Sequence, residues 1–565
     1  MEKFLYDNIV KLAIVISLPL WTAYALAEDI EEVIIVAQEV KTKQTDNLNS
    51  TKLISAIMPD VTWIAGGYGG NILYRERGTQ SVHTTVFKNG IPQNLPGSGW
   101  YDFGHDIVSG EQVSIISGAN SVMYGSGSMG GTVLIKDTIT PGVTYRAGSE
   151  RHRYMSVAPT DWLQFTDFSV NQEVRNDNVE EDVYENTSAK IIADAGDFKL
   201  YISGTDYAYD YDNCYTADFS QSNDCLQDGE RFTVSIRNEY FTIGRTEDKA
   251  EYFTEGASTY LNESSRDYFR IGDTADLSNL LQITYGVDGS RDQYGEKEQD
   301  NYGAFLSINA EFALEYNFGF RFGNQDQNAM RLGIAKDQFF FNVATSYRRP
   351  NLYETFGDAF VSANEDLLPE EGVGYELGFG ALSLFMYEFE EAIEYASGYT
   401  TTNIITPAIT TTDPDTGEIT TTPAVTEDVY TSPSYYNSGS YETQGIRFSN
   451  TYGPISIMLK FNDTDQTRIP EYIGVVQWQQ VIKGIEYKVK YAGQFDRTPG
   501  PYDVLAEGQE YLDDLKKLNF YVTKRYSNGF SVNFKLENIT DEEAEVLPYY
   551  DNEGREIYLT IQYTW

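Results

Sequence analysis

The chain has 565 residues, a formal net charge of -44 at neutral pH and a mean hydropathy of -0.41, and 14% of its residues are aromatic. So acidic a chain is a poor partner for nucleic acid, which is itself a polyanion. One short N-terminal run apart, no stretch approaches 18 consecutive apolar residues, so composition excludes a helical membrane protein. The acidity indicates solvated loops and a polar interior or, as the sharper alternative, a surface that attracts cations.

Residues 1–27 have the pattern of a secretory signal peptide. Two lysines precede or border an apolar run at 12–21, and Ala25 and Ala27 frame a small-x-small cleavage site. The alternative is a membrane anchor helix, but the run is shorter than the roughly 20 apolar residues that cross a bilayer. We therefore expect cleavage and export.

Residues 28–136 lack long alternating segments. They contain two glycine clusters and two short β-like runs, at 66–70, 125–131, 112–116 and 132–135. Glycine is favoured where backbone must turn or approach other chain closely. This pattern of glycine clusters and short β-like runs predicts a compact α/β or mainly β domain of roughly 100 residues. His83 and His105 fall in its loops and could touch a ligand, although lone histidines are more often polar surface residues.

The two cysteines and an acidic run lie close together further along the chain. Because an exported chain meets an oxidising compartment, Cys214 and Cys225 are expected to form a disulfide. Just before them come three aspartates that could chelate calcium, which binds six to eight oxygens: Asp206, Asp210 and Asp212. The alternative for the aspartates is a solvated acidic stretch.

From residue 141 to the C-terminus, apolar residues alternate with polar or small ones. Examples are the segments 281–287, 316–322, 455–461 and 530–536. Such alternation over about 9 to 11 residues predicts membrane-spanning strands, apolar towards lipid and polar towards a lumen. The last segment places five apolar residues on one face: Ile557, Leu559, Ile561, Tyr563 and Trp565. A large soluble β-sandwich or propeller is the weaker alternative, because of the signal peptide and the terminal aromatic.

Connections between these segments differ in length. Residues 526–529 read as a tight turn, whereas 397–436 form a long Thr- and Pro-rich segment. Short turns on one side and long loops on the other are typical of bacterial barrels. We expect 397–436 to be one extended external loop with little order.

Residues 111–135 resemble the end of the plug domain of TonB-dependent outer-membrane receptors. The matching positions are Val113, Ile115, Gly118, Tyr124, Gly125, Gly130, Gly131 and Val133. Arg77 and Gly78, with Arg75 nearby, resemble an upstream Ile-Arg-Gly motif of the same family. Further similarities lie at 57–61, 89–91, 347–354, 367–377 and 537–541, so the resemblance covers the whole mature chain.

The start of the mature chain resembles a TonB box, and its β-branched residues suit strand addition to a partner. The residues are Glu32, Val33, Ile34, Ile35, Val36 and Ala37. The expected organisation is a signal peptide, a box and linker, a plug, and a barrel, at 1–27, 28–45, 46–140 and 141–565. The resemblance implies an all-β transmembrane barrel of 22 antiparallel strands whose lumen holds the plug, in the outer membrane of a Gram-negative bacterium. It also implies that Trp565 is read by the barrel-insertion machinery.

The sequence departs from the family pattern in the plug. Ser117 stands where the family has an arginine, and the stretch between the box and Leu53 is short. We therefore expect that the first plug strand is missing. One plug-to-barrel ion pair is expected to be absent, which leaves Arg75 and Arg77 to carry more of the contact.

No catalytic constellation is present: there is no Gly-x-Ser-x-Gly, P-loop or paired-cysteine zinc spacing. We therefore expect that the protein is not an enzyme and that it holds no cofactor other than a structural calcium ion. The resemblance implies energy-coupled import of a scarce metal chelate by a monomer, with TonB, outer-membrane lipid and the chelate as partners. The alternative is a non-transporting surface receptor or adhesin, but a TonB box favours transport. Haem receptors of the family that the chain resembles usually carry a histidine near the motif at 347–354, and no histidine follows His152 here. The resemblance therefore favours a ferric siderophore or cobalamin over haem, with the two nearly level.

Aromatic residues in glycine-rich plug loops are the ligand-binding candidates. They are Tyr68, Trp100 and Tyr101. Glycine lets backbone approach a ligand, and an aromatic ring offers a flat face with a polar tip. The alternative is that these rings pack against the barrel wall as core residues.

Overall fold

The computed structural model describes residues 39–41, 61–63, 68–105, 112–172, 182–212, 214–216, 218, 220–324, 327–406, 409–412, 419–422, 425–500, 503, 505, 508–542, 544–548, 550–551 and 554–565. The expected signal peptide and TonB box, at 1–27 and 32–37, lie outside these residues. None of the described helices has the length and apolar character needed to span a membrane.

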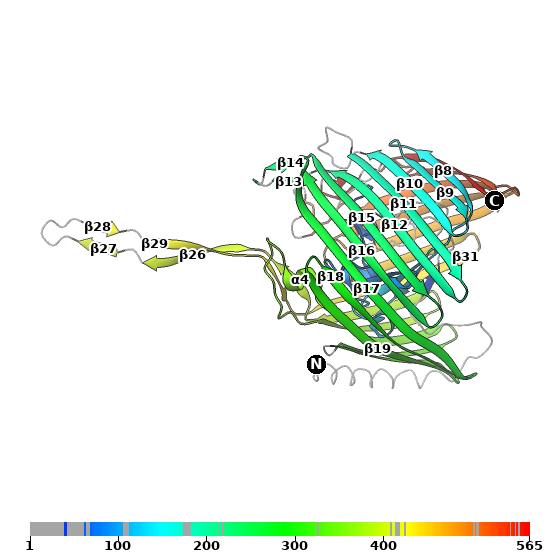
Figure 1. Cartoon of the computed structure of the whole chain (residues 1–565), viewed down its shortest axis with the longest axis horizontal. Coiled ribbons are helices and arrows are strands. Elements are labelled where there is room, and N and C mark those ends of the chain that lie inside the picture. The colour runs from blue at the N-terminus through cyan, green and yellow to red at the C-terminus, as the bar shows by residue number, and fades with distance from the viewer. Residues whose placement is uncertain are drawn as a thin grey trace.

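Twenty-two antiparallel strands close into a barrel, as expected from the sequence (Figure 1). In chain order they are β8 Gly142–Gly148, β9 Arg153–Thr160, β10 Leu163–Gln172, β11 Asp182–Ala195, β12 Phe198–Tyr211, β15 Cys225–Arg237, β16 Phe241–Thr254, β17 Ala257–Ser278, β18 Leu281–Tyr294, β19 Lys297–Glu311, β20 Glu315–Gly323, β21 Asn328–Lys336, β22 Phe339–Arg348, β23 Glu370–Phe379, β24 Leu382–Glu390, β31 Tyr441–Tyr452, β32 Ile455–Thr464, β33 Pro470–Ile482, β34 Ile485–Arg497, β35 Leu515–Arg525, β36 Phe530–Glu537 and β39 Glu556–Thr564. The last strand pairs with the first, from Tyr558 opposite Gly148 to Thr564 opposite Gly142, and so removes both sheet edges.

The closing strand shows why this sequence makes a barrel. Its outward residues are exposed at 40 to 49%, namely Ile557, Leu559, Ile561 and Tyr563, whereas Tyr558 and Thr560 are buried on the inner face. Successive side chains of a strand point to opposite faces, so an alternating sequence yields an apolar exterior and a polar interior. Trp565 follows this strand and is 58% exposed.

The two ends of the barrel differ. At one end, the turn end, strands are joined by two to four residues, as at 526–529 between β35 and β36. The other end, the loop end, carries α4 (Leu352–Phe356), the short pair β13 (Cys214–Tyr215) and β14 (Gln221–Ser222), and a long ribbon (Figure 1). The C-terminus lies at the turn end.

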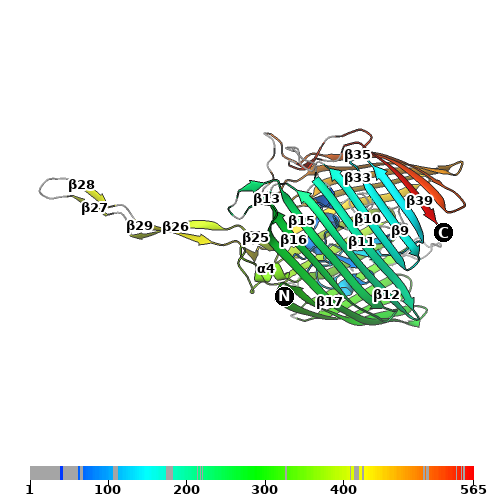
Figure 2. The same cartoon turned by 45° about the horizontal axis from the view of Figure 1, so that its top comes forward.

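The ribbon projects far from the barrel in both views (Figures 1 and 2). Three pairs of short strands build it: β25 Ile393–Ala396 with β30 Ser434–Asn437, β26 Tyr399–Thr406 with β29 Val425–Thr431, and β27 Ile409–Thr412 with β28 Ile419–Thr422. The expectation of little order over 397–436 is therefore wrong for the described part of this segment. Threonine, isoleucine and valine have high β-propensity. In this segment that propensity outweighs the disorder that a Thr- and Pro-rich composition predicts.

The N-terminal domain lies inside the barrel (Figure 1). Its main sheet has the order β1-β6-β7-β4-β5, with bounds Glu39–Lys41, Gln112–Ser117, Gly131–Lys136, Thr84–Lys88 and Ile91–Pro92. A small pair, β2 Val61–Trp63 and β3 Ile72–Tyr74, accompanies it, with the helical turns η2 Glu76–Gly78, η3 Ser81–His83 and α3 Ser121–Tyr124. The expectation that the first plug strand is missing is wrong, because β1 pairs with β6 from Glu39 opposite Ile116 to Lys41 opposite Ser114.

A compact apolar core holds this domain together. Its buried members are Ile72, Tyr74, Val86, Tyr101, Phe103, Val113, Ile115, Val133 and Ile135. They come from β3, β4, β6, β7 and the loop after Gly99, so strands distant in sequence share one core. Such a core is what lets a domain of this size fold inside a wide lumen.

Candidate functional site

Arg77 makes a fully buried contact between the plug and the barrel wall. Its side chain is 0% exposed, and its backbone is left-handed (φ 56°), which is uncommon for a residue with a side chain. The guanidinium donates to Glu376 of β23 and to the Tyr387 hydroxyl of β24 (2.6 Å). Tyr387 in turn donates to the same carboxylate (2.6 Å). Plug and barrel are thus joined by a charge-assisted network shielded from water.

An acidic residue of the plug, Glu76, lies beside the first contact, 3.4 Å from Arg77. Ser117 occupies the position where the family has an arginine, and its hydroxyl donates to Glu76 (2.8 Å). Burial alone would raise the pKa of Glu76, but Lys460, Arg77 and Arg447 are positive neighbours, and they lower that pKa to about 2. Glu76 is therefore an acidic group of the plug in the field of basic groups on barrel strands β31 and β32, and Ser117 adds an uncharged hydrogen bond to it.

Geometry places Lys460 in the same cluster as Arg77. The Arg77 guanidinium lies 4.9 Å, and the Lys460 ammonium 5.8 Å, from the centre of the Phe385 ring. Both cations are almost fully buried. Arg75, the other arginine expected to hold the plug, donates to the carbonyl of Thr467 in a barrel connection (2.8 Å).

His83 is a plug-to-barrel contact rather than a surface residue, contrary to the alternative given for it from the sequence. Its Nε2 lies 2.6 Å from Glu370 of β23, and its Nδ1 lies 2.7 Å from the Tyr441 hydroxyl of β31. The ring stacks on Phe389 at 4.9 Å. His105 is likewise buried, stacked on Tyr207 of the barrel at 3.8 Å.

The Glu370 carboxylate connects the plug to the loop end of the barrel. It accepts from Arg348 (2.6 and 2.9 Å), which also donates to Glu354 of α4 (2.8 and 3.1 Å). It further accepts from the amide of Ile393, where the ribbon begins (2.8 Å). A chain of buried polar contacts thus runs from His83 in the plug to α4 and the ribbon, which sequence reasoning missed.

Two of the three ligand-binding candidates are core residues. Tyr68 is fully buried, and its amide donates to Gln172 (2.6 Å) while its hydroxyl lies 2.8 Å from that of Tyr558. Tyr101 is buried edge-on against Phe103 (4.8 Å). For both residues the alternative holds, in which the ring packs as a core residue. The plug fills the lumen, so aromatic rings on its surface are buried against the barrel wall. Trp100 is partly exposed.

The plug loop that carries Trp100 docks on the barrel at its loop end. The amides of Leu352 and Tyr353 in α4 donate to the carbonyls of Pro96 (3.0 Å) and Gly97 (3.2 Å). Asn351, which precedes α4, donates from its side chain to the carbonyl of Ser98 (3.0 Å). A Cβ at Gly97 would lie 2.6 Å from the ring of Tyr294, so glycine is needed for this close approach.

The other motif residues of the plug shape its turns. Tyr124 ends α3 and packs its ring on Phe87 (5.3 Å), and Gly125 follows with φ 77°. A Cβ at Gly130 would lie 2.3 Å from the Thr79 hydroxyl, so only glycine fits there. Gly131 begins β7, and Gly78 ends η2.

Comparison with known proteins identifies the family. The family model described as the TonB-dependent receptor plug domain matches residues 28–132, and that described as the TonB-dependent receptor-like β-barrel matches residues 136–539. The chain belongs to the TonB-dependent receptors.

Named relatives of the receptor include transporters of one vitamin. It is 25% identical to the vitamin B12 transporter BtuB of Photobacterium profundum over 407 residues, which are 63% of this chain and 66% of that one. It is 22% identical to the same transporter of Vibrio cholerae serotype O1 over an alignment of 609 positions, with 93% and 92% coverage.

Solved structures share the fold of the receptor. The siderophore receptor PirA of Acinetobacter baumannii matches with a TM-score of 0.61 and 15% identity, over 89% of this chain and 94% of that one. The FrpB iron transporter of Neisseria meningitidis matches with a TM-score of 0.64 and 11% identity, over 93% and 97%. The expected family and fold are thereby confirmed.

A cavity of about 130 Å³ lies between the plug and the barrel wall of the receptor, beneath the docked plug loop. Its lining includes the plug turn 125–127 and two ion pairs of the barrel, Arg266 with Asp292 (2.6 Å) and Arg321 with Asp288. The charges of these four groups balance in pairs. The space is enough for a few waters and far too small for a bulky chelate.

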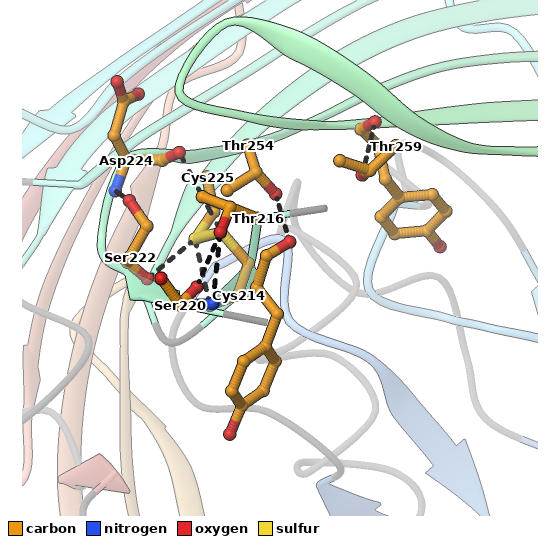
Figure 3. Close-up of a disulfide and its surroundings, with 10 residues drawn as sticks. Cys214, Thr216, Ser220, Ser222, Asp224, Cys225, Thr254 and Thr259 are labelled. Carbon is orange, nitrogen blue, oxygen red and sulfur yellow. Dashed lines mark hydrogen bonds between the residues drawn. A yellow bond between two sulfur atoms is a disulfide. The ribbon is translucent and has the colours of Figure 1, made fainter. Parts of the chain in front are cut away.

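Cys214 and Cys225 form the expected disulfide at the loop end of the receptor, with Cα atoms 6.0 Å apart (Figure 3). Around it, Thr254 donates to the carbonyl of Tyr215 (3.2 Å), and the amide of Asp224 donates to Ser222 (3.2 Å). The first bond ties the small pair β13–β14 to strand β16, and the second lies within the connection that leads from β14 to Cys225.

The calcium interpretation is wrong for the residues proposed. Tyr207 of β12 faces the plug, so its neighbours Asp206 and Asp210 alternate to the other face of the strand, whereas Asp212 is buried beyond the strand end. Among the described residues there is no group of three or more histidine, cysteine or acidic side chains placed to hold a metal ion.

Proposed function

We propose that this receptor imports a small metal chelate across the outer membrane of a Gram-negative bacterium, driven through TonB. The observation that carries the proposal is a plug that fills the lumen and is fastened to the wall by buried polar contacts of Arg77 and His83. A chelate could pass only if those contacts open, which requires an energy source. Cobalamin and ferric siderophores are the cargo classes suggested by the names of the relatives and fold neighbours.

The position of β1 supports coupling from the N-terminus. The predicted box ends at Ala37, and β1 begins at Glu39 as the edge strand of the plug sheet. A pull on the box would act first on the pairing of β1 with β6. Strand β6 ends at Ser117, which contacts Glu76, so force would reach the charged contacts through few residues.

The remaining partners follow from the surface of the barrel. Apolar residues on its outward face, such as Leu559 and Leu384, are 41 to 46% exposed and would contact lipid. On this proposal the loop end faces the exterior, because long loops are external in bacterial barrels. The closed barrel leaves no unpaired edge in its wall, which suits a monomer.

Uptake by cells tests the proposal. The receptor would be expressed in a Gram-negative host without its own cobalamin and siderophore receptors, with and without TonB. Accumulation of radiolabelled cyanocobalamin or of an iron-55 siderophore, present with TonB and absent without it, is the expected result. Equal accumulation with and without TonB, or none from a panel of both chelate classes, would contradict the proposal.

A further inference from the structure

Six tyrosines form a continuous row around the loop end of the barrel, which we call the tyrosine row. Its members are Tyr252, Tyr260, Tyr294, Tyr353, Tyr435 and Tyr395, and they belong to β16, β17, β18, α4, β30 and β25. Neighbouring rings lie 5.9 Å (252 to 260), 6.2 Å (294 to 353), 6.1 Å (353 to 435) and 5.5 Å (435 to 395) apart, and the hydroxyls of 260 and 294 lie 2.6 Å apart.

The row faces the interior of the barrel mouth. Tyr294 lies against plug residue Gly97, so it points into the lumen. Tyr260 shares a hydrogen bond with Tyr294, and Tyr252 is the cross-strand partner of Tyr260 and therefore points to the same side. All six side chains retain solvent exposure; that of Tyr395 is 46% exposed.

The row also meets the plug. Tyr353 donates its backbone amide to Gly97 in the loop that carries Trp100. A molecule resting on the row would therefore touch the plug loop and α4 together. Helix α4 is linked to the plug through Glu354, Arg348 and Glu370. Binding of a molecule to the row could therefore change the buried contacts between the plug and the barrel.

The acidic groups beside the row lie next to its tyrosines. The Tyr353 hydroxyl donates to Asp358 (3.3 Å), Glu354 follows Tyr353 in α4, and Glu394 precedes Tyr395 in β25. The nearby arginines are occupied, since Arg348 pairs with two glutamates and Arg349 donates to the carbonyl of Asp300 (3.2 Å). Lys297 is a second basic group near α4, with its ammonium 5.0 Å from the Phe356 ring. A multiply charged anion would be repelled.

We infer that the tyrosine row is the surface on which the receptor captures a metal chelate of zero or positive net charge that has a flat apolar face. The rings would cover that face, and the phenol hydroxyls would bond to polar groups at its edge. The inference rests on the proposed function and narrows it. A corrinoid and a cationic iron hydroxamate share this chemistry, whereas an iron catecholate with three negative charges lacks it.

Binding to the purified full-length receptor separates these cases. Three probes are titrated in detergent and followed by quenching of protein fluorescence: neutral cyanocobalamin, cationic ferrioxamine B and trianionic ferric enterobactin. The wild type is expected to bind cyanocobalamin or ferrioxamine B and to bind ferric enterobactin least. Preference for ferric enterobactin would overturn the charge argument.

Substitution locates the site. The double variant Tyr353→Ala/Tyr435→Ala is expected to weaken binding of the preferred probe by about tenfold or more, given two lost aromatic contacts. Tyr436→Ala is the matched control, because Tyr436 is next in β30, is 43% exposed and is absent from the row. Heat-modifiable migration verifies that each barrel is folded.

The outcomes are distinguishable. Wild-type affinity in the folded double variant would overturn the tyrosine row and leave the proposed function standing. Equal loss in Tyr436→Ala would assign the effect to the base of the ribbon and also overturn the row. If the wild type binds none of the three probes, and the cells take up none, the proposed function fails and the inference fails with it.

Discussion

The buried contact between Arg77 and Glu376 should be the strongest fastening of the plug. Glu376→Gln keeps the shape of the side chain and removes its charge. Arg77 is then left 0% exposed, with Glu76 as its remaining close anionic neighbour at 3.4 Å. Removing one member of a buried ion pair costs roughly 3 to 5 kcal/mol, because the other charge stays buried without its partner, and the remaining contact with Glu76 puts the expected cost at the lower end.

Hydrogen exchange of the plug measures this loss directly. A cost of about 3 kcal/mol corresponds to roughly a hundredfold more frequent opening, so amides of β6 and β7 should exchange about a hundredfold faster in Glu376→Gln. Glu388→Gln is the control, since Glu388 lies next to Tyr387 on β24 and alternates to the outer face. Identical plug exchange in the two variants would refute the reasoning.

Three further predictions follow from other contacts. Burial opposes ionisation of Glu76, but its cationic neighbours lower its pKa to about 2. The stabilisation by its charge should therefore be complete above pH 4.5, the ordinary pKa, and be lost as the pH falls towards 2. Hydrogen exchange of the plug should show this loss in the wild type and not in Glu76→Gln. Peptide mapping without reductant should recover Cys214 linked to Cys225, with reduction costing about 3 kcal/mol or less, and two free thiols would contradict it. Trp565→Asp should lower the amount of heat-modifiable barrel in the outer membrane, at a cost of about 0 to 4 kcal/mol depending on depth, and normal amounts would count against its role in assembly.

The barrel could be read from the sequence because its rule is local. Alternation at 557–563 or 316–322 reports the two faces of a strand without knowledge of its neighbours. The pairing of Cys214 with Cys225 was predictable for the same reason, since they are 11 residues apart. The long ribbon could not be read from composition, because threonine is common both in unstructured polar segments and in β-strands.

The plug contacts could not be read, because each partner comes from a distant strand. His83 meets Glu370 and Tyr441, 287 and 358 residues away, and nothing near His83 in sequence indicates either. One local signal was available: Asn351 and Glu354 form a capping box at α4, a spacing that marks a helix start. It would have placed a helix at the barrel mouth, where the plug loop docks.

Burial of the aromatic candidates was also beyond sequence reasoning. Tyr68 and Tyr101 sit in glycine-rich loops, as ligand-binding residues often do, yet both are enclosed by plug and wall. Whether such a ring meets a ligand or a wall depends on the depth of the plug in the lumen. That depth is set by contacts such as Arg77 with Glu376, which close only in the folded molecule.

The central claim is that tension on the N-terminal box opens a plugged importer, and Ile35→Pro tests it most directly. Proline removes a backbone donor and breaks strand addition to TonB, whereas Ile35→Val keeps a β-branched residue and serves as the control. Chelate uptake and chelate binding are measured on the same cells. The account predicts that Ile35→Pro binds the chelate like the wild type and imports none, while Ile35→Val does both; undiminished uptake by Ile35→Pro would contradict it.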